Sequence, residues 1–210
     1  MAPDYAAAAV AFLSAQDEDW ARLIKQIGPY SLKLHAQREP YEALIRAIAY
    51  QQLHARAAEA ILGRLVAQFP EFAFPPPQGI LDAEEERLRA CGFSASKIRA
   101  LKGIAAAAQQ GMIPSATVAQ GMSDEALIKQ LVTLRGVGQW TVEMLLIFTL
   151  GRTDVLPVDD FGVREGWRKL KRLPEQPKPR ALGEIGQAWS PYRTAAAWYL
   201  WQAAGQAAEL

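Results

Sequence analysis

The stretch Leu131-Val-Thr-Leu-Arg-Gly-Val-Gly-Gln-Trp-Thr-Val-Glu-Met144 decides the fold of this chain, and Leu156-Pro-Val-Asp-Asp-Phe161 follows it. Apolar residues recur at helical spacing up to Leu134. Gly136 can then end a helix, because glycine adopts the positive φ of a helix end at little cost. Gly138 leads into a second apolar run. The stretch therefore predicts a helix, a Gly-Val-Gly hairpin and a second helix.

Such a hairpin can bind a phosphate diester. Backbone N–H groups at the start of a helix lack partners, and the helix dipole adds partial positive charge there. The two glycines also let another backbone approach closely. The residues that would bind phosphate are Gly136, Val137, Gly138, Gln139, Trp140 and Thr141. The alternative is an ordinary corner between two helices, since Gly-x-Gly alone is a common turn.

Three further segments accompany the hairpin. The hairpin stretch, taken together with Leu-Pro-Val-Asp-Asp, resembles the helix-hairpin-helix superfamily of DNA glycosylases. Within that superfamily it is most similar to the 3-methyladenine DNA glycosylase II (alkylpurine glycosylase) branch. The segment 45–53 is similar to that family's Gln-bearing helix end, 91–97 to its Gly-x-Ser-x-x-Lys segment, and 189–201 to its last helix. These pieces run from about residue 40 to the C-terminus in the family's order, so the combination is specific.

The composition is that of a folded globular protein, because half of the 210 residues are hydrophobic and 21% are charged. Cys91 is the single cysteine, which excludes a disulfide framework and a four-cysteine iron–sulfur cluster and indicates a reducing compartment. Neither a basic-then-apolar leader nor an apolar run of membrane-spanning length is present. We therefore expect a cytoplasmic protein with no membrane association and no required cofactor.

The net charge of +1 does not by itself indicate a nucleic-acid partner. Acidic residues gather at 17–19 and 82–86, and basic residues at 97–102 and 164–172. Any attraction to DNA must then be local, and we expect modest, salt-sensitive affinity.

The hydrophobic pattern predicts an all-α chain, because no stretch alternates with period two and no repeat is present. Pro40 fits the first turn of one helix, and Asp82 is expected to cap another. The resemblance implies a two-lobed helical bundle with an active-site cleft between the lobes. We expect residues 1–210 to form a single, monomeric catalytic unit. One lobe would span about 40–150 and contain the helix-hairpin-helix at 123–150; the other would combine about 1–39 with 151–210.

Asp159 and Asp160 follow the second hairpin helix. A carboxylate at this point is commonly just a helix N-cap, and Asp160 before Phe161 fits that role. The resemblance implies that Asp160 is the catalytic residue and that Asp159 supports it, as a helix cap or a neighbouring polar group. An aspartate suits the reaction, since breaking an N-glycosidic bond builds positive charge on the sugar, which a carboxylate stabilises.

Trp140 stands where bifunctional relatives carry a lysine nucleophile, so the resemblance implies a monofunctional enzyme. It also places Trp140, Met144 and Trp201 in the pocket for the extruded base, with Met144 at a position that is often aromatic. Indole faces favour a cationic base by about 1 to 2 kcal/mol. The alternative is that these tryptophans belong to the core, as most of six in an all-α protein would.

The end of the helix that begins near Pro40 carries Gln52, Leu53 and His54. The resemblance implies that this point enters the minor groove and fills the gap left by the flipped nucleotide, with Gln52 or Leu53 as the wedge. By sequence alone, Leu53 could equally be core and the glutamines a solvated helix end. His54 departs from the family's usual small residue.

The hairpin could also bind a structural sodium or potassium ion through main-chain oxygens, which the resemblance assigns to Val132, Leu134 and Val137. The two histidines have no companions at metal-ligand spacing, so no zinc site is expected. Lys97 and Arg193 could contact DNA backbone, pair structurally or lie on the surface.

The expected activity is therefore release of alkylated purines, chiefly 3-methyladenine and 7-methylguanine, from double-stranded DNA in base excision repair. Two alternatives remain open: another lesion (hypoxanthine, ethenoadenine or uracil), or a non-catalytic DNA-binding module. The chain starts directly in helical sequence, whereas some bacterial members begin with a β-rich domain, and we expect a more open site.

Overall fold

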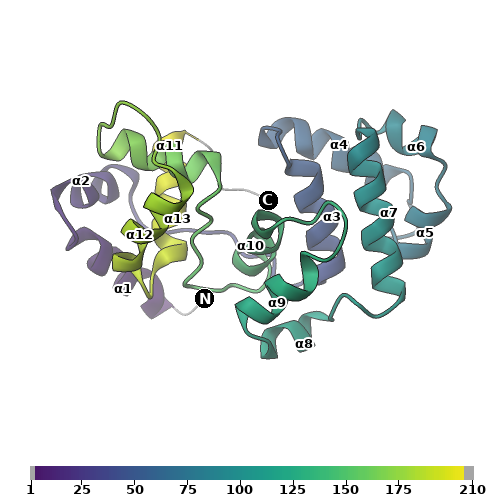
Figure 1. Ribbon diagram of the computed structural model, residues 1–210, viewed down its shortest axis with the longest axis horizontal. Coiled ribbons are helices and arrows are strands. Elements are labelled where there is room, and N and C mark those ends of the chain that lie inside the picture. Colours follow the sequence, from purple (N-terminus) through teal and green to yellow (C-terminus); the bar gives the residue numbers. More distant parts are fainter. Residues whose placement is uncertain (1–2, 206–210) are drawn as a thin grey trace. The chain divides into compact units, whose positions relative to one another are not determined.

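A computed structural model describes residues 3–205, and within that range the regular elements are all helices. The prediction of an all-α chain is thus confirmed (Figure 1). The helices are α1 (Pro3–Ser14), α2 (Glu18–Ile27), α3 (Pro40–Tyr50), α4 (Ala55–Ala67), α5 (Pro77–Asp82), α6 (Glu85–Ala90), α7 (Ala95–Gln109), α8 (Ala116–Gly121), α9 (Asp124–Leu131), α10 (Gln139–Phe148), α11 (Phe161–Leu170), α12 (Pro179–Gly186), the 3-10 turn η1 (Gln187–Trp189) and α13 (Arg193–Ala204).

The described chain forms two compact units, each with its own core. The terminal unit comprises residues 3–34 and 151–205, and it contains α1, α2, α11, α12 and α13. The central unit comprises residues 35–150 and contains α3 to α10.

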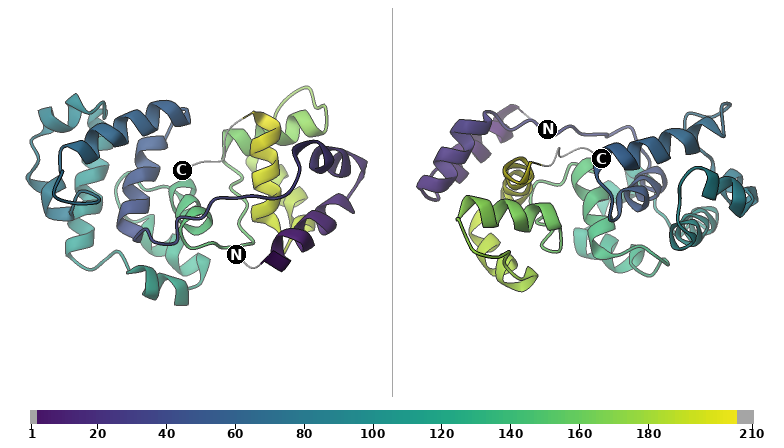
Figure 2. Two further views of the ribbon diagram at one scale, coloured as in Figure 1. Left: turned by 180° about the vertical axis from the view of Figure 1, so that it is seen from behind. Right: turned by 90° about the horizontal axis from the view of Figure 1, so that it is seen from above.

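The core of the central unit forms around α3, which packs against α4, α7 and α10. Pro40 occupies the first turn of α3, as its sequence position predicts, and Leu44, Ile45 and Ile48 are fully buried. Apolar residues of α7 meet them, and the two helices run side by side (Figures 1 and 2). Every residue of α10 from Thr141 onward is buried, so α10 is a central element of this unit.

In the terminal unit, α11 packs closely along α13. Gly166 makes this approach possible, because a Cβ at that position would lie 2.0 Å from the carbonyl oxygen of Leu200. Three indoles fill the space beside them: Trp189 lies 5.4 Å from Trp20 and 5.1 Å from Trp167 between ring centroids. Most tryptophans of the unit therefore serve its core.

Two expected helix boundaries are wrong. The first hairpin helix, α9, ends at Leu131 rather than at Gly136, and residues 132–138 form a longer turn. Gly136 lies within that turn at φ +83°, where a Cβ would come within 2.6 Å of the Ala100 side chain. Its lack of a side chain is thus required by packing as well as by backbone conformation.

The second wrong boundary concerns Asp82, which is the last residue of α5 instead of the cap of an acidic helix. The acidic helix α6 begins at Glu85, after an N-cap residue, Glu84, that makes no side-chain cap bond. Backbone packing of α5 on α7 overrides the local capping preference here. Asp17 and Ser94, by contrast, are the N-caps of α2 and α7, and each side chain accepts a backbone N–H of its helix.

Candidate functional site

Asp160 lies at the N-terminus of α11, and its carboxylate is held by two donors. Oδ1 accepts the backbone N–H of Val163 at 2.9 Å and the indole N–H of Trp201 at 2.9 Å. The first bond makes Asp160 the N-cap of its helix. The second links it to α13, 41 residues further along the chain. Asp160 is thus both a helix cap and a half-buried carboxylate with a fixed orientation.

The solvent exposure of Asp160 differs from that of Asp159 and Phe161, the residues on either side of it. Asp159 is exposed and the N-cap of α11 is Asp160, and the supporting role of Asp159 stays a prediction. Phe161 follows with 60% of its surface exposed. Trp201, in contrast, is only 4% exposed. The carboxylate therefore lies where a buried indole and an exposed helix start meet.

A bidentate ion pair fixes the start of α13. The Arg193 guanidinium donates to Asp154, with Nε–Oδ1 at 2.8 Å and Nη2–Oδ2 at 2.9 Å, and Ser190 donates to the same carboxylate. Burial acts to raise the pKa of Asp154, but these hydrogen bonds and the positive charge of Arg193 hold it below its ordinary value. Arg193 therefore pairs structurally.

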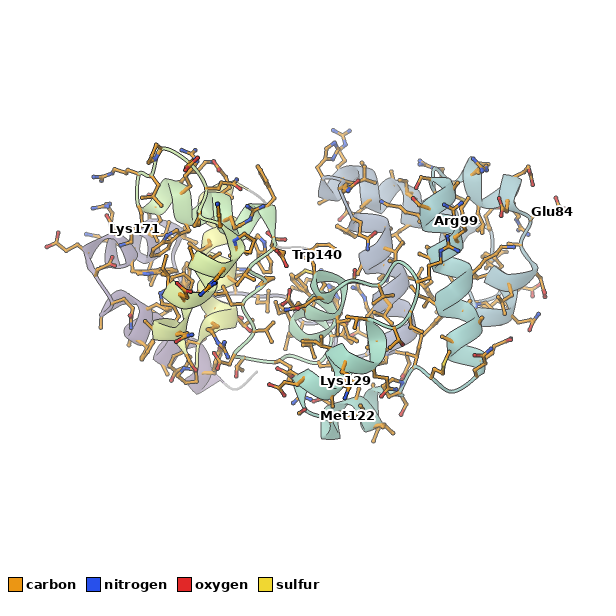
Figure 3. All side chains as sticks on the ribbon, in the orientation of Figure 1. Glu84, Arg99, Met122, Lys129, Trp140 and Lys171 are labelled. Atoms are coloured by element: carbon orange, nitrogen blue, oxygen red, sulfur yellow. The ribbon has the colours of Figure 1, made fainter. Side chains whose placement is uncertain are left out.

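Two basic residues at the end of α11 and just after it, Arg168 and Lys171, form ion pairs within the terminal unit. The ammonium of Lys171, labelled in Figure 3, lies 2.6 Å from an oxygen of Asp17 and 3.0 Å from one of Asp19. Arg168 pairs with Glu165 at 2.7 Å. The run of positive charge at 164–172 is thus partly neutralised by neighbouring carboxylates.

The hairpin presents the start of α10 without a side-chain cap. Gly138 is the N-cap residue, and a Cβ there would meet nothing within 4 Å. Gln139 is exposed, and Trp140, labelled in Figure 3, is partly buried in the first turn of α10. Met144, one turn on, is 3% exposed. The first turn of α10 is therefore open to an approaching group at Gly138.

The turn that carries the predicted wedge residues joins α3 to α4. Gln52 adopts φ +57°, a left-handed conformation that is uncommon for a residue with a side chain. Leu53 is 40% exposed, so it is not a core residue. His54 is exposed and caps α4, with its Nδ1 accepting the N–H of Ala57 at 3.3 Å. An apolar side chain thus projects from a constrained turn.

Lys97 and Gln51 connect this turn to the rest of the central unit, a role that the sequence left open for Lys97 and did not indicate for Gln51. The Lys97 ammonium donates to the carbonyls of Ala49 and Gln51, and burial lowers its pKa. The Gln51 amide reaches the hairpin. No sequence pattern could have found the second link, because its partners are 85 and 90 residues away.

Within residues 3–205, no group of three or more His, Cys, Asp or Glu side chains is placed to hold a metal ion. The carbonyl oxygens predicted to bind a monovalent cation all belong to the hairpin turn. That of Leu134 accepts the N–H of Val137 at 3.1 Å and keeps a second lone pair. Carbonyl oxygens suit such an ion, so the residues fit, and the site stays a prediction. None of the helices in the described range is long and apolar enough to span a membrane.

A family model described as the HhH-GPD superfamily of base excision DNA repair proteins matches residues 45–191, which include the hairpin and Asp160. The chain belongs to this superfamily. The resemblance inferred from the Leu-Arg-Gly-Val-Gly-Gln-Trp-Thr stretch is thereby confirmed. The match also covers the turn that carries the predicted wedge residues and the whole of α11, which follows Asp160.

Individual members of the superfamily are similar over nearly the whole chain. DNA-3-methyladenine glycosylase 1 of Schizosaccharomyces pombe is 49% identical over 191 residues, which are 90% of this chain and 84% of that protein. The solved structure of an S. pombe 3-methyladenine DNA glycosylase in complex with abasic DNA matches with a TM-score of 0.91 and 47% identity, covering 96% of this chain and 98% of that one. A DNA-3-methyladenine glycosidase from Bacillus halodurans matches with a TM-score of 0.76 and 35% identity, over 94% of this chain and 89% of that one.

Proposed function

We propose that this protein is a monofunctional DNA glycosylase of base excision repair that flips alkylated purines out of double-stranded DNA and hydrolyses their N-glycosidic bonds. The observation that carries the proposal is the Asp160 carboxylate, held by the indole of Trp201 and the N–H of Val163. Superfamily membership and the 3-methyladenine glycosylases among the similar proteins support it.

Asp160 acts on the sugar. As the base departs, the deoxyribose takes on positive charge, and a carboxylate fixed nearby stabilises that charge without having to reorient. The same group can orient the attacking water and take its proton. Two hydrogen bonds to Oδ1 limit the movement of the carboxylate. Such preorganisation contributes about 10²- to 10³-fold to a rate in comparable sites.

The substrate class follows from the leaving group. A purine alkylated at N3 or N7 is already cationic and departs as a neutral base, so it needs little help from a general acid. A single aspartate can therefore suffice, and 3-methyladenine and 7-methylguanine are the expected bases. Trp140, Met144 and Trp201 remain the predicted pocket residues, with indole faces that favour a cationic ring.

The product is an abasic site and a free base. Trp140 occupies the position where bifunctional relatives have lysine, and an indole cannot form the Schiff base that strand cleavage requires. The solved S. pombe relative was captured with abasic DNA. The enzyme would therefore leave the DNA strand intact for the next repair step.

Two elements of the central unit would hold the DNA. The start of α10 at Gly138 offers backbone N–H groups to a phosphate, and a cation bound to hairpin carbonyls would add positive charge beside it. The turn at Gln52 and Leu53 would fill the space vacated by the flipped nucleotide. The protein would act as a monomer in the cytoplasm.

The deciding experiment measures release of free base from duplex DNA that contains a single 7-methylguanine. Wild type and Glu184→Gln, which removes one exposed charge from the same unit, should release it. Asp160→Asn should release the base about 10²-fold more slowly or worse. Its free energy of unfolding should match that of the wild type, because asparagine is also a good N-cap. Release of base only from duplexes carrying hypoxanthine, ethenoadenine or uracil would identify one of these lesions as the substrate instead. Duplex binding without release of any base would instead indicate a binding module.

A further inference from the structure

The turn between α3 and α4 is anchored on the hairpin by one side chain. Gln51 is half-buried, and its amide donates to the carbonyl oxygen of Gly136 at 3.1 Å and to the hydroxyl of Thr141 at 3.0 Å. Thr141 is 1% exposed and lies in the first turn of α10. The amide is therefore bonded both to the hairpin turn, at Gly136, and to the buried first turn of α10, at Thr141.

A second contact holds the backbone of the same turn. The ammonium of Lys97, from the first turn of α7, lies 2.9 Å from the carbonyl oxygen of Ala49 and 2.8 Å from that of Gln51. These carbonyls end α3, where intrahelical N–H partners run out and the helix dipole favours a positive charge. Ala100, on the next turn of α7, packs against Gly136. Helix α7 thus supports both the turn and the hairpin.

The backbone between these anchors is in a conformation that needs support. Gln52 has φ +57°, and residues with side chains persist in this region where their surroundings hold them. Leu53, the next residue, is 40% exposed. The exposed apolar side chain of Leu53 therefore owes its position to the contacts that the half-buried Gln51 and Lys97 make beside it.

We propose that Gln51 is a positioning residue that sets the separation between the wedge turn 52–54 and the phosphate-binding hairpin 136–141. This inference rests on the proposed glycosylase function. Successive phosphates on one DNA strand are spaced by about 3.4 Å along the axis. The donor–acceptor distance of a hydrogen bond can change by only a few tenths of an ångström. The two bonds of the Gln51 amide therefore hold the wedge in register with the phosphate bound at Gly138.

The variant Gln51→Met tests this role, because methionine keeps the length of the side chain and removes both donors. The control is Gln110→Met, at an exposed position at the end of α7. With saturating enzyme and a duplex carrying one 7-methylguanine, Gln51→Met should release the base about tenfold more slowly than wild type or the control. Its affinity for undamaged duplex should stay within about twofold, since the phosphate contacts are intact.

A spectroscopic readout separates positioning from general damage to the fold. A duplex with 2-aminopurine opposite a tetrahydrofuran abasic analogue reports unstacking when the wedge enters. Gln51→Met should give about half of the wild-type fluorescence rise or less, with an unchanged helical circular dichroism spectrum. Thr141→Val, which removes one acceptor of the same amide, should act in the same direction, and the double variant should be no worse than Gln51→Met alone.

Each outcome is decisive. An unchanged release rate and fluorescence rise for Gln51→Met overturn the inference, and so does a loss of undamaged-duplex affinity that parallels the loss of rate. If the wild type releases no base but gives the fluorescence rise, the glycosylase proposal fails, while the effect of Gln51→Met on that rise still tests the positioning role. If Gln51→Met proves unstable, Thr141→Val and Lys97→Met provide the same comparison.

Discussion

The indole N–H of Trp201 donates a 2.9 Å hydrogen bond to Oδ1 of Asp160, which joins the end of α13 to the start of α11. The same oxygen accepts the N–H of Val163. The orientation of the carboxylate therefore depends on how these two helices pack. Gly166 sits where the backbones of the two helices come close together, so the packing is sensitive to a single added methyl group.

Removing the indole donor should slow base release. Trp201→Phe keeps an aromatic side chain but loses the N–H that holds Asp160, and a hydrogen bond to a charged group contributes about 1.5–3 kcal/mol. We expect release of 7-methylguanine to fall about tenfold or more. The matched control is Trp198→Phe in the same helix, a 6% exposed tryptophan that stacks edge-on with Tyr30.

The double variant separates loss of the hydrogen bond from loss of bulk. If Trp201 acts through Asp160, then Asp160→Asn combined with Trp201→Phe should release base about as slowly as Asp160→Asn alone. Multiplied losses would show that Trp201 contributes independently, for example by stacking on the base. Trp198→Phe should lower the free energy of unfolding similarly to Trp201→Phe and leave the release rate near wild type.

A methyl group at Gly166 should destabilise the terminal unit. Its Cβ would lie 2.0 Å from a carbonyl oxygen in α13, and backbone atoms cannot move aside as a flexible side chain can. Gly166→Ala should therefore lower the free energy of unfolding by about 3 kcal/mol, measured by urea denaturation. Gly183→Ala is the control, since a Cβ there meets only Val158 at 3.7 Å; it should be neutral or raise stability by about 0.5 kcal/mol. Equal stability of the two variants would contradict the close packing of α11 on α13.

A large side chain at Gly138 should weaken binding to all DNA alike. The position has φ −94° and open space around it, so Gly138→Leu is compatible with the fold. The added side chain would block the approach of a phosphate to the start of α10, and we expect affinity to fall about tenfold. Fluorescence anisotropy with undamaged and 7-methylguanine duplexes measures it. A loss confined to the damaged duplex would argue against phosphate binding at the hairpin.

The stability of the terminal unit should fall in acid through Asp154. Burial acts to raise the pKa of this carboxyl, but hydrogen bonds from Arg193 and Ser190 and the positive charge of Arg193 keep it below its ordinary value of 3.8. A depressed folded-state pKa means that the stabilisation is complete at neutral pH and is lost as pH falls below the ordinary value. Asp154→Asn should be less stable at pH 7 and show a shallower decline from about pH 5 to 3. Glu184→Gln, which breaks an exposed pair, should retain the wild-type profile.

The family and the helical class could be predicted from the sequence because both depend on local features. The Gly-Val-Gly hairpin, Pro40 in the first turn of α3 and the absence of period-two alternation are each features of a few neighbouring residues. The position of the candidate carboxylate could also be predicted from the sequence. Asp160 follows a turn and starts a helix, and the motifs around it come in the order that the superfamily resemblance implies.

Helix ends were less predictable. Gly136 was expected to end α9, but that helix ends at Leu131, because the turn is shaped by the packing of Gly136 against Ala100 in another helix. Asp82 likewise ends α5 instead of capping α6. In both cases a tertiary contact overrides a local preference whose contribution is about 1 kcal/mol or less.

By itself, the sequence determined which residues can form helices, turn or carry charge, since these properties belong to single side chains and short spacings. Only the tertiary structure decided that Trp201 donates to Asp160, that Arg193 pairs with Asp154, and that Gln51 reaches the hairpin. Hydrogen bonds require partners within about 3 Å. Contacts between residues tens of positions apart arise when helices pack, and no periodicity along the chain records which side chains then meet.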